Sequence, residues 1–141
     1  MGKSILEKIK ITPLKITQIA SGNVMKALQK NELKKWSFGE AYFSKIKYNR
    51  IKAWKYHLKM TLNLVVPFGK VKFVFYSQKE NIFKVVEIGQ KNYCRVTVPP
   101  KIWFGFKGCH KNESIILNIS NAQFNSKEIL RRKINEIKYN W

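Results

Sequence analysis

Eight short segments rich in β-branched and aromatic residues follow one another through most of the chain. Many of them alternate apolar and polar side chains, and polar turns such as Glu80-Asn81 separate them. Segments of this composition at this short spacing are typical of the strands of a β-sandwich or β-barrel. The sequence therefore predicts an all-β fold, with strands at residues 40–48, 51–58, 63–67, 71–76, 82–88, 93–98, 102–106 and 114–119.

The segment 51–58 indicates which of its side chains share a face. Successive residues of a regular strand point to opposite sides, so Lys55 and His57 are expected on one face. Trp54 and Tyr56 are expected on the other face, as part of the core or of a dimer contact. This strand therefore predicts a lysine and a histidine that point together toward one space.

Helical patterns are short and lie near the two ends of the chain. Pro13 favours an extended conformation in residues 3–16, and residues 21–31 are consistent with a short helix or turn. Residues 126–137 show apolar side chains at helical spacing behind Ser126, a candidate N-cap. We expect a C-terminal helix there.

The size of the chain indicates one domain spanning residues 1–141. A chain of 141 residues with 45% hydrophobic residues can bury a substantial core. No apolar stretch reaches the roughly 20 residues that cross a bilayer, and lysines interrupt the N-terminal region. We expect a cytoplasmic protein with no membrane partner, in which Cys94 and Cys109 are free thiols.

The charge of the chain indicates a class of partner but no function. A formal net charge of +20 attracts polyanions of any kind. Most of the cations are lysines spread along the chain, whereas specific recognition of bases and phosphates favours arginine. A basic nucleic-acid-binding protein is therefore an alternative function, and no specific nucleic-acid partner is expected.

Several sequence blocks occur together in one order. They are TPLKI at 12–16, FGEAYFSKI at 38–46, KAWKYH at 52–57, NLVVPFGKVKFVFY at 63–76, VPPKIWFGFKG at 98–108, SIILNIS at 114–120 and the terminal IKYNW. In this order they resemble the dTDP-4-dehydrorhamnose 3,5-epimerase family. The resemblance implies a cupin-like jelly-roll β-barrel, a homodimer, and a nucleotide-linked sugar as partner in surface polysaccharide biosynthesis.

The resemblance also implies a reaction, but this sequence has different residues at the positions that carry out that reaction in the family. The family inverts carbon centres beside a 4-keto group, using a histidine base, a tyrosine acid and a lysine near the keto oxygen. Lys55 stands at the histidine position, Ala122 near the tyrosine and Leu62 near the lysine. Lys52 is at the position of an arginine that would meet phosphate. The chain thus resembles a short, divergent member without the family's histidine and tyrosine pair.

His57 and Lys55 are the candidate catalytic residues. A histidine, or a desolvated lysine with a lowered pKa, can remove a proton beside a carbonyl group. The alternative for His57 is a packed side chain without a catalytic role. Candidate substrate-binding residues are Lys52, Tyr48, Trp103 and Phe104.

No metal or dissociable cofactor is expected. Metal-binding cupins have a pattern of three histidines and a glutamate. In this sequence only His57 matches that pattern. One ligand does not define a site for a divalent ion.

The sequence thus favours an epimerase or isomerase acting on a 4-keto-6-deoxy sugar nucleotide. The alternative from another class is a catalytically inactive sugar-nucleotide binding or scaffold protein. A cleft containing Lys52, Lys55 and His57 would favour these two functions, and a continuous lysine face without a cleft would favour nucleic-acid binding.

Overall fold

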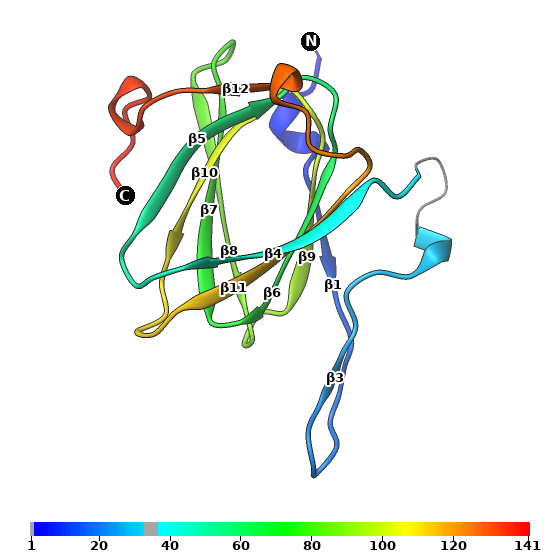
Figure 1. Ribbon diagram of the computed structural model, residues 1–141. Helices are drawn as coiled ribbons and strands as arrows, with labels where there is room; N and C mark the ends of the chain where they lie inside the picture. The colour runs from blue at the N-terminus through cyan, green and yellow to red at the C-terminus, as the bar shows by residue number, and fades with distance from the viewer. Residues whose placement is uncertain (1, 33–36) are drawn as a thin grey trace.

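The chain folds into two antiparallel sheets that face each other and enclose a core, as Figure 1 shows for a computed structural model describing residues 2–32 and 37–141. Among these residues each of the two large sheets has five strands. The first has the order β1-β9-β6-β11-β4 and the second β12-β5-β10-β7-β8. This confirms the predicted all-β, cupin-like jelly-roll fold.

The first sheet contains β1 (Lys10–Pro13), β9 (Cys94–Val98), β6 (Leu62–Phe68), β11 (Ser114–Ser120) and β4 (Glu40–Ile46), and the second contains β12 (Ile129–Arg131), β5 (Ile51–His57), β10 (Trp103–Gly108), β7 (Lys70–Ser77) and β8 (Ile82–Gly89). All eight predicted strands are present, with ends shifted by at most two residues. No helix among the described residues is long and apolar enough to cross a membrane.

Two apolar clusters lie on opposite sides of the second sheet. The main core fills the space between the two sheets and includes Phe73, Phe75 and Phe104. A second cluster covers the outer side, where Ile137 of the C-terminal segment packs with Trp54 and Trp103. Alternation along the strands explains this division, because neighbouring residues of a strand face opposite clusters.

The prediction of a C-terminal helix at 126–137 is wrong. This segment forms a 3-10 turn, η3 (Ser126–Glu128), then β12 and a second turn, η4 (Ile134–Glu136). Strand β12 pairs with the edge of β5, with Ile129 opposite His57 and Arg131 opposite Lys55. Pairing with an edge that offers free backbone groups outweighs the helical spacing of the apolar residues.

The N-terminal region also differs from a simple extended or helical segment. A 3-10 turn, η1 (Ile5–Lys8), precedes β1, and β2 (Ile16–Thr17) pairs with β3 (Val24–Met25) in a hairpin. Figure 1 shows this hairpin projecting away from the barrel. Residues 21–31 therefore contribute a turn, a short strand and η2 (Lys30–Glu32), and the only helical residues are those of η2. The short helical segments expected near both ends of the chain are present as 3-10 turns.

Candidate functional site

A cavity of about 130 Å³ lies between the two sheets. Its lining includes Lys55 and His57 from β5, Phe104 from β10, and Tyr42 and Asn118 from the facing sheet. Lys52 also reaches this lining. The structure thus brings four of the six predicted site residues, Lys52, Lys55, His57 and Phe104, to one cavity.

A register shift explains why Lys52 joins Lys55, although residues three apart should face opposite ways on a regular strand. Phe104 pairs with Lys55 and Gly105 with Ala53, so Trp54 has no partner in the ladder between them. Such a bulge turns the residues on one side of it relative to those on the other. Trp54 is buried in the outer cluster, as the sequence predicted for it.

His57 is held in place by a carboxylate. Its Nδ1 forms a short hydrogen bond with Oε1 of Glu128, and its ring stacks on Phe104 with centroids 6.0 Å apart. Both partners are largely buried, and His57 is only 8% exposed. The second ring nitrogen, Nε2, is the one left for a ligand.

Glu128 is further fixed by the backbone of the β5–β6 connection. Its Oε2 accepts hydrogen bonds from the amides of Lys59 (3.1 Å) and Met60 (3.2 Å). Burial raises the pKa of this carboxyl, but the hydrogen bonds from His57, Lys59 and Met60 outweigh burial and lower it overall. An ionised Glu128 can accept a hydrogen bond from Nδ1–H, which leaves Nε2 as the ring nitrogen that can act as a base.

Lys55 lies in a cationic and partly desolvated environment. Burial lowers the pKa of its ammonium group, and the nearby charges of Arg131 and Lys52 lower it further. A lysine of this kind can stabilise a negative oxygen while charged, or exchange a proton more readily than an exposed lysine. The position next to His57 suits either role.

Tyr42 and Asn118 form the opposite wall of the cavity. The Nδ2 of Asn118 donates to the hydroxyl of Tyr42 at 3.0 Å, and Asn118 is only 3% exposed. Its Oδ1 is buried without a hydrogen-bond partner in the described part of the chain. An unpaired polar atom in a cavity wall is costly unless a ligand or water completes it, so it marks this wall as a binding surface.

A second pocket of about 320 Å³ adjoins this cavity and shares Lys52, Lys55 and Phe104 with it. Arg131 and Arg132 from the C-terminal segment complete its lining. The four cations make it a suitable place for an anion such as a diphosphate.

Two predicted substrate-binding residues lie elsewhere. Tyr48 is exposed near Arg50 and Phe68 at one end of the barrel. Trp103 points to the outer side of the second sheet, where it packs with Tyr56. Phe104, by contrast, points into the cavity.

Glu128 and Arg131 are site residues that sequence reasoning missed. Both lie in the segment predicted to be a helix, and Glu128 is 71 residues from His57. The scarcity of acids, eight Asp and Glu in the chain, was the one available signal. That signal does not say which carboxylate is buried.

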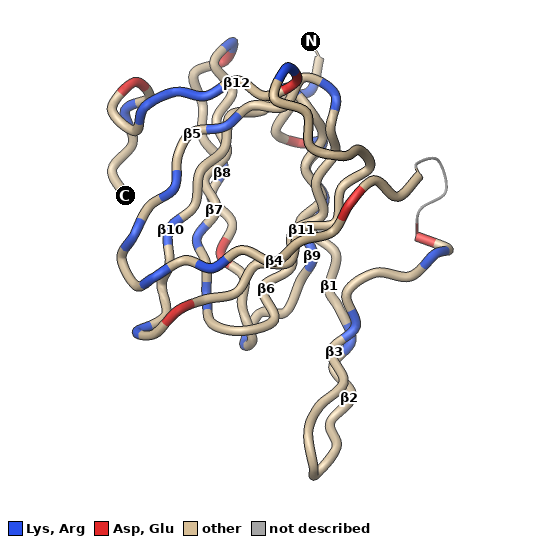
Figure 2. The backbone as a smooth tube through the Cα atoms, viewed as in Figure 1, with Lys and Arg blue, Asp and Glu red and all other residues tan. Residues whose placement is uncertain are grey.

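No cluster of three or more His, Cys, Asp or Glu side chains with the geometry of a metal site occurs within residues 2–32 and 37–141. Figure 2 shows Lys and Arg spread around the barrel wall and along the hairpin and C-terminal segment. The cations in this view do not form one continuous face.

No family model matches the sequence, and no curated protein matches it at a significant level. Solved structures do match. A dTDP sugar isomerase from Desulfovibrio desulfuricans G20 is 27% identical with a TM-score of 0.89, over 96% of this chain and 91% of that one.

Two further structures share the fold at lower identity. One is the dTDP-6-deoxy-D-glucose-3,5-epimerase of Legionella pneumophila in complex with dTDP-4-keto-L-rhamnose, 14% identical with a TM-score of 0.81, over 95% of this chain and 78% of that one. The other is a sugar 3,4-ketoisomerase from Thermoanaerobacterium thermosaccharolyticum in complex with TDP, 14% identical with a TM-score of 0.77, over 94% and 96%. The structural neighbours of this chain are thus dTDP-sugar epimerases and related isomerases.

Proposed function

We propose that this protein is an isomerase of nucleotide-linked 4-keto-6-deoxy sugars, acting as an epimerase or as a related keto-sugar isomerase. The observation that carries the proposal is the buried pair of His57 and Glu128 in the barrel cavity. The similarity to a dTDP sugar isomerase over nearly the whole of both chains supports the substrate class.

In this proposal the two adjoining spaces divide the substrate between them. The cavity of about 130 Å³ accommodates the sugar ring, and the pocket of about 320 Å³ accommodates the diphosphate between Lys52, Arg131 and Arg132. Tyr42 and Asn118 offer hydrogen bonds to sugar hydroxyl groups from the opposite wall.

The proposed reaction begins when Nε2 of His57 removes a proton from the carbon beside the keto group. The electrons of the broken C–H bond form a carbon–carbon double bond to the carbonyl carbon, and the keto oxygen becomes a negatively charged enolate oxygen. The Lys55 ammonium group is placed to stabilise this charge, which is usually a large contribution to such catalysis. Glu128 stabilises the imidazolium ring that results.

A proton then returns to complete the isomerisation. Tyr42, on the wall facing His57, is the candidate acid for return to the opposite face of the same carbon. Where the deprotonated carbon carries a hydroxyl group, delivery of the proton to the former carbonyl carbon would instead move the keto group, because the proton of that hydroxyl passes to the old keto oxygen and a new C=O forms. Which of the two occurs depends on how the sugar lies between His57 and Tyr42.

The test is exchange of sugar protons in deuterated water with dTDP-4-keto-6-deoxyglucose as substrate, followed by NMR. We expect incorporation of deuterium beside the keto group, and a decrease of at least about 1,000-fold for His57→Asn. His110→Asn is the matched control, because His110 lies in a loop outside the cavity and should leave exchange unchanged. Absence of exchange across a panel of such sugars would reject the enzymatic function.

A second candidate is a sugar-nucleotide binding or scaffold protein without activity. The observation that favours it is that, in the resemblance, Lys55 stands at the position of the family histidine and Ala122 near that of the tyrosine. It predicts binding of the nucleotide sugar, seen in the same samples by shifts of the substrate signals, without any exchange. Binding of an oligonucleotide in preference to the sugar nucleotide would instead favour a nucleic-acid-binding protein.

We also propose a homodimer, formed through the outer face of the first sheet. Phe43 of β4 is 69% exposed there, beside the partly buried Leu117 and Ile119 of β11. An apolar patch of this kind commonly marks an interface. Sedimentation at micromolar concentration distinguishes a dimer from a monomer. The proposed setting is surface polysaccharide synthesis, which the sequence resemblance implies, in the cytoplasm, which the lysines of the N-terminal region favour.

A further inference from the structure

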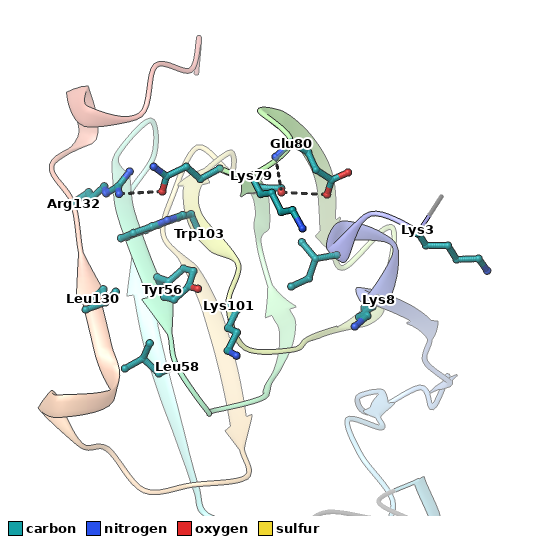
Figure 3. Close-up of a pocket in the computed structure, with 14 residues that line it drawn as sticks. Lys3, Lys8, Tyr56, Leu58, Lys79, Glu80, Lys101, Trp103, Leu130 and Arg132 are labelled. Carbon is teal, nitrogen blue, oxygen red and sulfur yellow. Dashed lines mark hydrogen bonds between the residues drawn. The ribbon is translucent and has the colours of Figure 1, made fainter.

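A separate cleft of about 710 Å³ lies on the outer side of the second sheet. Figure 3 shows it between the N-terminal turn η1, the β7–β8 turn and the C-terminal segment. Tyr56 and Trp103 form its wall at the sheet, and they alternate along their strands with His57 and Phe104, which face the barrel cavity. The sheet therefore separates the cleft from the barrel cavity, and Arg132 lines both the cleft and the pocket of about 320 Å³ beside that cavity.

Lys and Arg are more frequent in the lining of this cleft than in the chain as a whole. Five of its fourteen lining residues are Lys or Arg, compared with 28 of 141 in the whole sequence. None of the five forms an ion pair with a carboxylate in the described part of the chain. The cations are Lys3, Lys8, Lys79, Lys101 and Arg132.

One carboxylate, Glu80, also borders the cleft, but it is engaged by neighbours. Its Oε1 accepts hydrogen bonds from the hydroxyls of Ser4 (2.7 Å) and Ser77 (3.2 Å). These bonds connect the N-terminal turn to the β7–β8 turn across one edge of the cleft. Glu80 therefore shapes the cleft and leaves the lysines for an anionic ligand.

The wall at the sheet offers the apolar surfaces of Tyr56, Leu58 and Leu130 beside the cations, and Trp103, which is 5% exposed, lies behind Arg132. The rings of Tyr56 and Trp103 lie 5.0 Å apart, and the guanidinium of Arg132 lies 4.5 Å from the centre of the Trp103 ring. Arg132 also donates to Gln78 at 3.0 Å, which fixes its orientation. Leu58 and Leu130 are 36% and 45% exposed at the same wall.

We propose that this cleft is a second binding site, for a nucleoside di- or triphosphate. Lys8, Lys79 and Lys101 would contact the phosphates, and the base would lie against Tyr56, Leu58 and Leu130. The volume of the cleft falls within the range of small-molecule sites, which is about 300–1,000 Å³. A single nucleotide fits this combination of ring surface and clustered cations better than a polymer, which would need a longer groove.

The test is titration with ADP and with inorganic pyrophosphate, followed by calorimetry and by the indole NMR signal of Trp103. We expect ADP to bind and to shift the Trp103 signal, and pyrophosphate to bind more weakly because it has no ring. Lys79→Gln/Lys101→Gln should weaken ADP binding by at least about 10-fold, the usual effect of losing charge-assisted contacts. Both lysines are exposed with no side-chain hydrogen bond in the described chain, so the fold should tolerate the change.

Two controls separate this site from charge alone and from the barrel cavity. Lys15→Gln/Lys26→Gln removes the same charge from the exposed β2–β3 hairpin, and Lys55→Gln alters the barrel cavity. ADP binding unchanged in both controls supports the proposal. The proposal is overturned if ADP does not bind, or if the hairpin variant weakens ADP binding as much as the cleft variant does. It is also overturned if only Lys55→Gln abolishes ADP binding, or if a single-stranded oligonucleotide binds far more tightly than ADP.

Discussion

The inner and outer faces of the β12-β5-β10-β7-β8 sheet both carry lysines, but the two faces hold them in different surroundings. Inside the barrel, Lys55 lies beside a buried histidine whose carboxylate partner, Glu128, is fixed by two backbone amides. Outside, Lys79 and Lys101 lie at an open cleft without an ion-pair partner among the described residues.

This difference separates two kinds of chemistry on one sheet. A buried side chain held by a hydrogen bond keeps one orientation, which lets it take up and return a proton at a fixed position, as general acid–base catalysis requires. Exposed cations remain hydrated and mobile, which suits attraction and binding of an anion but gives little control over a proton. In our proposals the inner face therefore carries the reaction and the outer face binds a nucleotide.

The largest expected effect comes from removing the carboxylate of the inner face. Glu128→Ala leaves His57 and the amides of Lys59 and Met60 without their acceptor, so the free energy of unfolding should fall by about 3 kcal/mol. Urea unfolding measures this loss. Glu80→Ala, which removes the exposed carboxylate of the outer cleft, is the control and should cost less than about 1 kcal/mol.

The Glu128 variant also has a predicted pH dependence. The folded protein lowers the pKa of Glu128 below its ordinary value of 4.5, so the carboxylate stabilises the fold above pH 4.5. This contribution is lost as the pH falls through the folded pKa. The difference between wild type and Glu128→Ala should therefore shrink in acid, and an equal difference at pH 7 and in strong acid would contradict the assignment.

Tyr42→Phe tests the wall that faces His57. If Tyr42 returns the proton, deuterium incorporation should persist, because His57 is intact, while formation of the isomerised product falls by about 100-fold. Its hydrogen bond with Asn118 is one neutral contact, so stability should change by only about 1 kcal/mol. Tyr48→Phe, at an exposed position outside the cavity, is the matched control. Equal rates of product formation in both variants would remove Tyr42 from the mechanism.

The smallest expected effect is a gain in stability from Lys55→Met. Burial, Arg131 and Lys52 lower the pKa of Lys55 below 10.5, so its charge opposes folding at neutral pH. Methionine should raise the free energy of unfolding by about 1 kcal/mol at pH 7, because solvent still reaches part of the side chain. The gain should decrease as the pH rises through the folded pKa and should vanish above 10.5, where Lys55 is neutral in the unfolded chain as well.

Lys101→Met on the outer face is the control for this comparison. Lys101 is exposed, so its replacement should leave the stability close to that of the wild type. Chemical unfolding at pH 7 and pH 10 measures both variants. A loss of stability in Lys55→Met would show that the charge of the inner lysine is compensated within the fold.

The strands and the orientation of β5 could be predicted from the sequence. Alternation and residue type are local properties, and they gave the eight strands and placed Lys55 and His57 on the face opposite Trp54 and Tyr56. They also led to one wrong element. The apolar spacing of residues 126–137 fits a helix, and only the unpaired edge of β5 decides that part of it becomes β12.

The amino-acid sequence alone thus determined the fold class and two inward-facing residues of the candidate site. Tertiary structure decided the rest. The contact between His57 and Glu128 joins residues 71 apart, and the bulge at Trp54 brings Lys52 to the same cavity as Lys55. Strand pairing between distant segments selects both arrangements, and that pairing depends on which backbone edges meet in the folded barrel, which no local pattern records.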